Sequence, residues 1–207
     1  MDIQYYGANC VRLSTKKSSV IVDDNLAELG LKSVTKSDDI ALFTTVHAPS
    51  KVAKLEIDTP GEYEASGVSI RGIAARAHID EEGQRNATIY KIIIGDIRIA
   101  VVGHVHPDLS EDQLETLGTV DVAIVPVGGA GYTLDPIGAV KVIKKISPKL
   151  VIPTHYADKA IDYPVPQVEL EEAIKGLSME PNEPVDTLKL KTSEFTDTVQ
   201  LAVLNRR

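Results

Sequence analysis

Apolar runs of strand length alternate with polar turns through the first half of the chain. β-branched and aromatic residues dominate these runs, which is typical of strands. Gly95 and Asp96 separate the last two runs, so we expect a hairpin there. Residues 26–36 stay ambiguous, because Gly30 interrupts any helical pattern. The expected strands are 3–6, 10–13, 20–22, 40–46, 68–73, 88–94 and 97–102.

Helix signals appear in the second half, where they alternate with further strands. Ser110 and Gln113 have the spacing of a capping box. Asp135 followed by Pro136 predicts a second helix, which runs to residue 146. A third helix is expected over 167–176, and strands over 120–125, 150–152, 188–190 and 199–204. This order predicts two mixed β-sheets packed together with helices outside, in a single domain over 1–207.

The composition narrows the classes of function. A total of 22 Lys and Arg against 30 Asp and Glu gives a net charge of −8, which argues against a dedicated nucleic-acid binder. The single cysteine, Cys10, excludes an intramolecular disulfide and a thiolate metal cluster. No secretory signal pattern opens the chain, and no apolar run approaches the ~18 residues of a membrane span. We therefore expect a soluble cytoplasmic protein.

The five histidines each follow an expected strand or lie in a loop. His47, His104 and His155 come directly after strands, and His78 lies in a polar loop. His104 and His106 are one residue apart, so their side chains point the same way in an extended segment. Imidazole is the commonest metal ligand and an ordinary acid–base group near neutral pH. This distribution fits a functional sheet edge and scattered surface histidines equally well, and the spacing alone favours solvated side chains.

A glycine-rich segment, Pro126 to Thr133, follows an expected strand. It lacks the Gly-x-x-x-x-Gly-Lys-Ser/Thr pattern of a phosphate loop, so a tight strand-to-helix turn is favoured over phosphate binding. The sequence contains no Gly-x-Ser-x-Gly nucleophile elbow. Cys10 fits a small buried side chain better than a nucleophile.

Several segments carry a resemblance to a known family. They are Gly103-His-Val-His-Pro-Asp-Leu-Ser-Glu-Asp-Gln-Leu114, Pro126-Val-Gly-Gly129 and Val151-Ile-Pro-Thr-His-Tyr156, with Pro60-Gly-Glu-Tyr-Glu64 and Tyr6-Gly-Ala-Asn-Cys10 in support. Together they resemble the metallo-β-lactamase superfamily, and within it the small ascorbate-6-phosphate-lactonase-like branch of zinc-dependent hydrolases. The resemblance covers nearly the whole chain. It implies an α/β (α+β) fold, a four-layer αββα sandwich of two mixed β-sheets flanked by helices.

The first metal motif departs from the family pattern. The family loop Thr-His-x-His-x-Asp-His reads Thr45-Val-His-Ala-Pro-Ser-Lys-Val52 here, so only His47 survives and Lys51 takes the carboxylate position. His104 stands where the resemblance implies an Asp ligand. With both carboxylates gone, little negative charge remains to hold two dications about 3.5–4 Å apart. The sequence therefore predicts no intact two-metal site.

A single divalent metal ion remains compatible with the histidines. The resemblance implies His47, His78, His104 and His155 as its ligands, with His106 as a further candidate ligand. Zinc is the first choice of ion, with manganese or iron as alternatives, and neutral imidazoles suit it. Binding of one metal ion and binding of none stay equally open.

Two functions stay open. In the first, the protein is a divergent mononuclear metal-dependent hydrolase in which zinc-bound water attacks an ester, lactone or phosphoester. In the second, it is a non-catalytic relative that binds no metal and uses the remodelled cleft for a small anionic metabolite or a protein partner, as Lys51 suggests. No catalytic residue is assigned, and the candidate cleft residues are Lys51, Asp80, Tyr132 and Thr133.

The expected partner is a small-molecule substrate or ligand, with no membrane; an oligomer stays open. A nuclease of the same superfamily is the weakest alternative, because it needs a basic surface and the chain is acidic. The residues that could form such a surface are Lys141, Lys144, Lys145 and Lys149.

Overall fold

The first sheet is built mainly from the N-terminal part of the chain. The structure is a computed structural model that describes residues 1–47 and 51–207. Within these residues it contains six strands in the order β12-β1-β2-β3-β4-β5. β1 to β3 form an antiparallel meander, and β3 to β5 run parallel. The bounds are β1 Asp2–Gly7, β2 Cys10–Ser14, β3 Ser19–Val22, β4 Ile40–Leu42, β5 Leu55–Ile57 and β12 Leu188–Lys189.

The second sheet contains seven of the described strands, in the order β13-β11-β10-β9-β8-β7-β6. β6 to β9 are antiparallel, whereas β9, β10, β11 and β13 run parallel. The expected hairpin is present, because β8 and β9 pair across Gly95 and Asp96. The bounds are β6 Gly61–Ala65, β7 Val68–Ala75, β8 Ala87–Ile94, β9 Ile97–Val101, β10 Val122–Pro126, β11 Leu150–Thr154 and β13 Gln200–Leu201.

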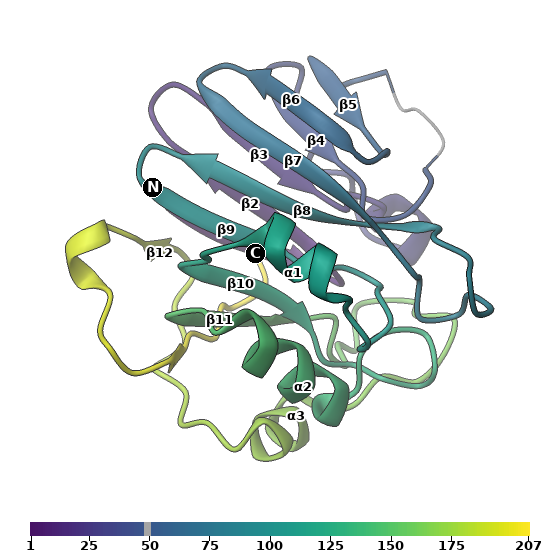
Figure 1. Cartoon of the computed structure of the whole chain (residues 1–207). Coiled ribbons are helices and arrows are strands. Elements are labelled where there is room, and N and C mark those ends of the chain that lie inside the picture. Colours follow the sequence, from purple (N-terminus) through teal and green to yellow (C-terminus); the bar gives the residue numbers. More distant parts are fainter. Residues whose placement is uncertain (48–50) are drawn as a thin grey trace.

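The α-helices of the described chain lie against the outer face of the second sheet (Figure 1). They are α1 Glu111–Leu117, α2 Pro136–Ile146 and α3 Leu170–Leu177. The expected capping box at Ser110 and the cap at Asp135 are both present. On the outer face of the first sheet, a 3-10 helix, η1 Leu26–Leu29, packs with Leu31 and Val34 against the strands. Short helix and extended chain therefore form the fourth layer there.

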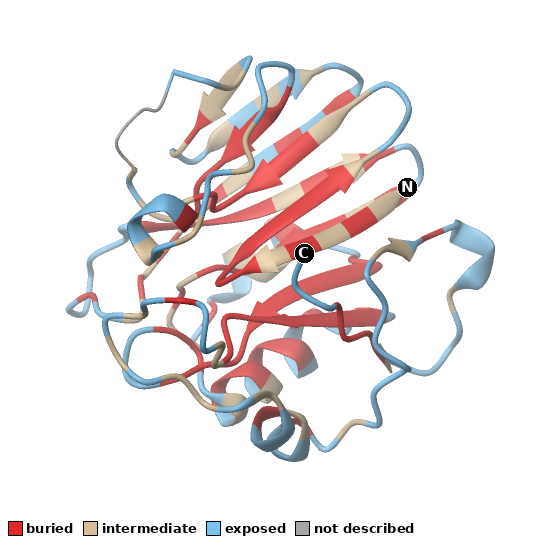
Figure 2. Cartoon of the chain, turned by 180° about the vertical axis from the view of Figure 1, so that it is seen from behind, coloured by how far each residue is buried: buried red, intermediate tan, exposed pale blue. Residues whose placement is uncertain are grey.

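The core lies between the two sheets, and Figure 2 shows buried residues concentrated in their strands. Every residue of β10 and β11 is buried, as expected for parallel strands covered on both faces. β1, which lies next to the edge strand β12 in the first sheet, alternates between buried and half-buried positions. This arrangement confirms the predicted α/β sandwich of two mixed sheets.

Three predicted elements have bounds that differ from the structure by three residues or more, and tertiary hydrogen bonds explain two of them. The strand expected over 40–46 ends at Leu42, since Thr45 bridges to Ala87 in the other sheet. The third helix begins at Leu170 instead of residue 167, because Val168 donates its N–H to the oxygen of Gly128. Of the strand expected over 199–204, only Gln200–Leu201 pairs as β13. The sequence analysis also missed β5 and β6.

No helix among the described residues is long and apolar enough to cross a membrane. The glycine-rich segment forms the expected tight turn between β10 and α2, with Gly129 and Gly131 at positive φ. Tyr132 at this turn donates its N–H to the oxygen of Gly129.

Candidate functional site

Two histidines follow parallel strands of the second sheet. His104 comes three residues after the end of β9, and His155 directly follows β11. The carboxyl ends of parallel strands share one edge of a sheet, which is where open α/β sheets place their sites. His155 adopts a left-handed backbone conformation, with φ at 57°, and donates its N–H to the oxygen of Ala8 in the turn between β1 and β2.

A short antiparallel bridge brings two more histidines to this edge. Ala77 pairs with Val105, and the N–H of His78 donates to the oxygen of His104 at 2.8 Å. The rings of His78 and His106 have centroids 6.1 Å apart. His104 and His106, which are one residue apart in the sequence, therefore lie on either side of the bridge residue Val105.

The rings of His104 and His155 meet edge to face, with centroids 4.9 Å apart. Each ring is oriented by an amide side chain. The Nδ1 atom of His104 lies 3.3 Å from Asn9 Nδ2, and the Nδ1 atom of His155 lies 3.0 Å from Gln167 Oε1. Tyr132 completes the cluster, with its ring centroid 5.3 Å from that of His104.

Both imidazoles of this pair are neutral at pH 7. Burial lowers the pKa of His104 to about 3, and the neighbouring rings of His155 and His78 add to the shift. Burial lowers the pKa of His155 to about 4, although the hydrogen bond with Gln167 acts to raise it. A neutral imidazole has one nitrogen with a free lone pair, which is the form that ligates metals and accepts hydrogen bonds.

A pocket of about 240 Å³ opens beside this pair. Its lining includes His104, His155 and the rings of Tyr132 and Tyr163. The ring of Tyr163 lies 5.0 Å from that of His155. Two carboxylates, those of Glu28 and Asp162, also line it, and no Lys or Arg is among its described lining residues. The pocket is therefore better suited to a neutral or cationic group than to an anion.

His47 lies in a different environment. Its ring stacks on Phe43 at a centroid distance of 3.8 Å and an interplanar angle of 9°. With Glu56 and Asp58 it lines a separate pocket of about 160 Å³. Among the described residues, no three His, Cys, Asp or Glu side chains form a group that could hold a metal ion. The proposed role of His47 as a fourth ligand stays a prediction.

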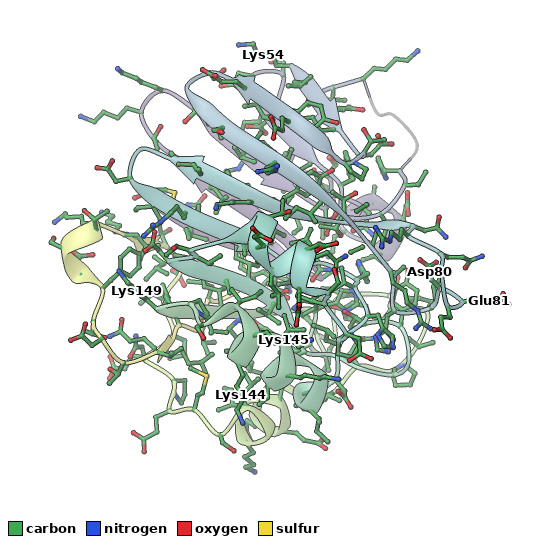
Figure 3. All side chains as sticks on the ribbon, in the orientation of Figure 1. Lys54, Asp80, Glu81, Lys144, Lys145 and Lys149 are labelled. Atoms are coloured by element: carbon green, nitrogen blue, oxygen red, sulfur yellow. The ribbon has the colours of Figure 1, made fainter. Side chains whose placement is uncertain are left out.

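The other candidate residues have varied surroundings. Asp80 lies in the loop between β7 and β8 (Figure 3), where it accepts hydrogen bonds from Ala77 and Asn86. Burial acts to raise the pKa of Asp80, but these bonds hold it below its ordinary value. Thr133 is fully buried, and its hydroxyl has no hydrogen-bond partner among the described residues. Lys51 is exposed, with φ at 58°.

His106 is oriented by its own loop. The N–H of Asp108 donates to His106 Nδ1 at 3.2 Å. The Asp108 carboxylate also pairs with Lys141 on α2. No described contact joins His106 to His155, so its role as a further ligand stays a prediction.

Three of the four lysines that could form a basic surface, Lys141, Lys145 and Lys149, have an acceptor among the described residues. Lys145 donates to the oxygen of Leu109 at 2.8 Å, and Lys149 lies 3.5 Å from the Asp121 carboxylate. In Figure 3, Lys144 and Lys145 come from α2, and Lys149 from the chain just before β11. These separate attachments give the nuclease hypothesis no support.

Five residues of this site escaped the sequence analysis: Asn9, Glu28, Asp162, Tyr163 and Gln167. Asn9 is 3% exposed within an otherwise apolar segment, and a polar residue at such a position is a signal that could have identified it. Gln167 was assigned to the third helix, whereas it lies before the helix and reaches His155. Nothing in the sequence marks Tyr163.

A buried carboxylate supports the backbone before His104. Asp23 accepts hydrogen bonds from the N–H and the hydroxyl of Thr44, each at 2.7 Å. The Thr44 side chain fills the space beside Gly103, where an added Cβ atom would lie 2.4 Å from it. Gly103 also has a positive φ of 66°, which disfavours other residues.

We expect Asp23 to make the protein less stable as the pH rises. Burial raises its pKa from 3.8 to about 6, against the hydrogen bonds from Thr44. Between about pH 4 and 6 the unfolded chain loses this proton while the folded chain keeps it, so the free energy of unfolding falls by roughly 2–3 kcal/mol. Urea unfolding across this range should show a shallower fall for Asp23→Asn, with exposed Asp96→Asn as the control. Parallel curves for wild type and Asp23→Asn would contradict this assignment.

Comparison with known proteins shows which family this chain resembles. A family model described as a beta-lactamase superfamily domain matches residues 2–155, from β1 to His155. A UPF0173 metal-dependent hydrolase of Thermoplasma volcanium is 30% identical over 119 residues, which are 55% of this chain and 51% of that protein. A UPF0173 metal-dependent hydrolase of Thermococcus onnurineus is 31% identical over 100 residues, 46% of this chain and 44% of that protein.

The chain spans about half the length of the curated relatives that it matches. A crystal structure from Thermotoga maritima, described as a proposed Zn-dependent hydrolase of the metallo-beta-lactamase superfamily, aligns over 99% of this chain and 98% of that one. Its TM-score is 0.75 at 23% sequence identity, so the likeness is one of fold.

Proposed function

Because this chain belongs to the beta-lactamase superfamily, we propose that it is a metal-dependent hydrolase-like protein that works with a single divalent metal ion. The site is the row of imidazoles formed by His78, His104 and His155. The observation that carries the proposal is the contact of two neutral histidines, at a centroid distance of 4.9 Å, on the edge where the parallel strands end. The named relatives, both described as metal-dependent hydrolases, support it.

The chemistry of these side chains allows one ion at most. The Nδ1 atom of His78 is buried without a hydrogen-bond partner among the described residues, and such a nitrogen lacks the partner that burial demands. The ring of His155 is held through Nδ1 by Gln167, the outer-sphere arrangement usual for ligating histidines. The imidazoles bring no negative charge, which leaves a second dication without compensation. Zinc is the proposed ion, since it accepts imidazole readily.

A bound divalent ion would act as a Lewis acid that polarises a carbonyl or phosphoryl oxygen. The chain's own residues supply the rest of the site. Tyr132 and Tyr163 narrow the pocket beside the histidines, and Glu28 and Asp162 make it unfavourable for anions. Esters and lactones without added negative charge are therefore the proposed substrates, ahead of phosphoesters.

We expect the purified protein to contain about one equivalent of a divalent metal, zinc in first place. Plasma mass spectrometry on untagged protein prepared without chelator measures this. His155→Ala should lose the metal, because it removes the ligand that Gln167 orients. His47→Ala should keep the metal, since His47 stacks on Phe43, and loss of the metal in this variant would assign His47 as a ligand instead. Absence of metal after soaking at neutral pH, or equal content in wild type and His155→Ala, would refute the proposal.

A second candidate function is binding of a small ligand without metal or catalysis. The observation that favours it is that no three potential ligands gather among the described residues. The carboxylates of the pocket then point to a neutral or cationic ligand, although Lys51 had suggested an anionic one. A thermal-shift screen on chelator-treated protein tests this candidate, and stabilisation lost in Tyr132→Ala would support it.

A further inference from the structure

The amide side chains beside the two histidines of the pocket face them with different atoms. Beside His155 lies Gln167, whose Nε2 donates to the oxygen of Val165 at 2.9 Å. That bond fixes the amide, so that Oε1 faces His155 Nδ1 at 3.0 Å. An amide oxygen only accepts, and His155 must therefore donate from Nδ1. Its Nε2 atom then has a free lone pair.

For His104 the neighbouring amide is turned the other way. The hydroxyl of Thr154 donates to Asn9 Oδ1 at 2.9 Å, inside the protein. This leaves Asn9 Nδ2 facing His104 Nδ1 at 3.3 Å. An amide nitrogen only donates, so His104 Nδ1 must accept. In the neutral ring the hydrogen then sits on Nε2, the nitrogen on the far side from Asn9.

We propose that His104 is a hydrogen-bond donor to the substrate and not a metal ligand, while His155 offers the unprotonated nitrogen beside it. This inference rests on the proposed function and narrows it: of the three imidazoles in the row, His78 and His155 stay as the candidate metal ligands, and His104 faces the substrate instead. One ring nitrogen of His104 is occupied by Asn9 and the other carries hydrogen, so neither has a lone pair free for a metal ion. The lack of a three-ligand group among the described residues agrees with this division.

These different tautomers give a role to His104, which stands where the family resemblance implies an Asp ligand. His104 lines the pocket next to His155, so a carbonyl oxygen held there can accept from its N–H. A donor aimed at that oxygen stabilises the negative charge that develops when the carbonyl is attacked. Because Glu28 and Asp162 line the same pocket, the substrate class is a neutral or cationic ester, lactone or amide.

Nitrogen-15 NMR of the histidine rings in chelator-treated full-length protein tests the assignment. Long-range proton–nitrogen correlations show which ring nitrogen is protonated, and His104→Gln and His155→Gln assign the signals. We expect hydrogen on Nε2 of His104 and on Nδ1 of His155. Hydrogen on Nδ1 of His104 in the wild type overturns the inference.

Asn9→Asp supplies a second test, since a carboxylate accepts from Nδ1 and should move the hydrogen of His104 there. The freed Nε2 lone pair should then tighten Co²⁺ binding by about tenfold or more. Gln167→Glu is the matched control, because it keeps an acceptor beside His155 and should leave both tautomers unchanged. An unchanged His104 tautomer in folded Asn9→Asp overturns the inference.

The two proposals fail separately. If the wild-type tautomers are as expected but no metal binds, the proposed function fails and the hydrogen-bond assignment stands. If one equivalent of metal binds while His104 carries its hydrogen on Nδ1, the proposed function stands and this inference fails. The wild-type spectrum decides the tautomers even if Asn9→Asp does not fold.

Discussion

Replacing Gly128 by alanine is expected to destabilise the protein by about 3 kcal/mol or more and to dismantle the histidine pocket. A Cβ atom at this position would lie 1.9 Å from the backbone oxygen of His155 and 2.1 Å from Gln167 Oε1. The first contact is with backbone, which cannot rotate away. The Gly128 oxygen also accepts the N–H of Val168, so the loop that carries Gln167 would shift with it.

Urea unfolding and metal content together measure this effect. Gly67→Ala is the matched control, because Gly67 has φ at 73° and nothing within 4 Å of an added Cβ. It should cost only the backbone strain of about 1–2 kcal/mol and leave the metal content unchanged. If Gly128→Ala keeps the stability and metal content of the wild type, the backbone at Gly128 does not pack as closely against His155 as the structure indicates.

The second large effect is expected at the buried ion pair of the first sheet. Arg12 Nη1 lies 2.5 Å from Asp39 Oδ1, and both side chains are almost fully buried, with 6% and 0% of their surface exposed. Arg12 also donates to Ser19 and to the oxygen of Val34. Asp39→Ala would leave the guanidinium buried without its counter-charge, and we expect a loss of about 3–5 kcal/mol in the free energy of unfolding.

The exposed pair of Arg71 and Glu62 is the comparison for this variant. These side chains are 50% and 75% exposed, so Glu62→Ala should cost less than about 1 kcal/mol. A double variant with Arg12→Met and Asp39→Leu should recover much of the loss, since an apolar pair needs no desolvation. Equal losses in Asp39→Ala and Glu62→Ala would mean that the buried pair is solvated in the folded protein.

The strands of this fold could largely be predicted from local pattern, because a buried strand needs only an apolar run and a turn at each end. The hairpin across Gly95 and the helix caps at Ser110 and Asp135 are of this kind. The predictions failed where a long-range hydrogen bond overrode local preference. Thr45 leaves its strand to bridge Ala87, and Val168 delays the third helix by pairing with Gly128.

The same division holds at the site. Chain order and apolar pattern suffice to predict that His104 and His155 lie at strand ends. Three features could be found only in the folded chain: these two rings meet, His47 stacks elsewhere on Phe43, and Asn9 lies beside His104. The contacts of His104 with His155 and Asn9 join residues that are far apart in the sequence, and hydrogen-bond orientation depends on three-dimensional neighbours that no local pattern encodes.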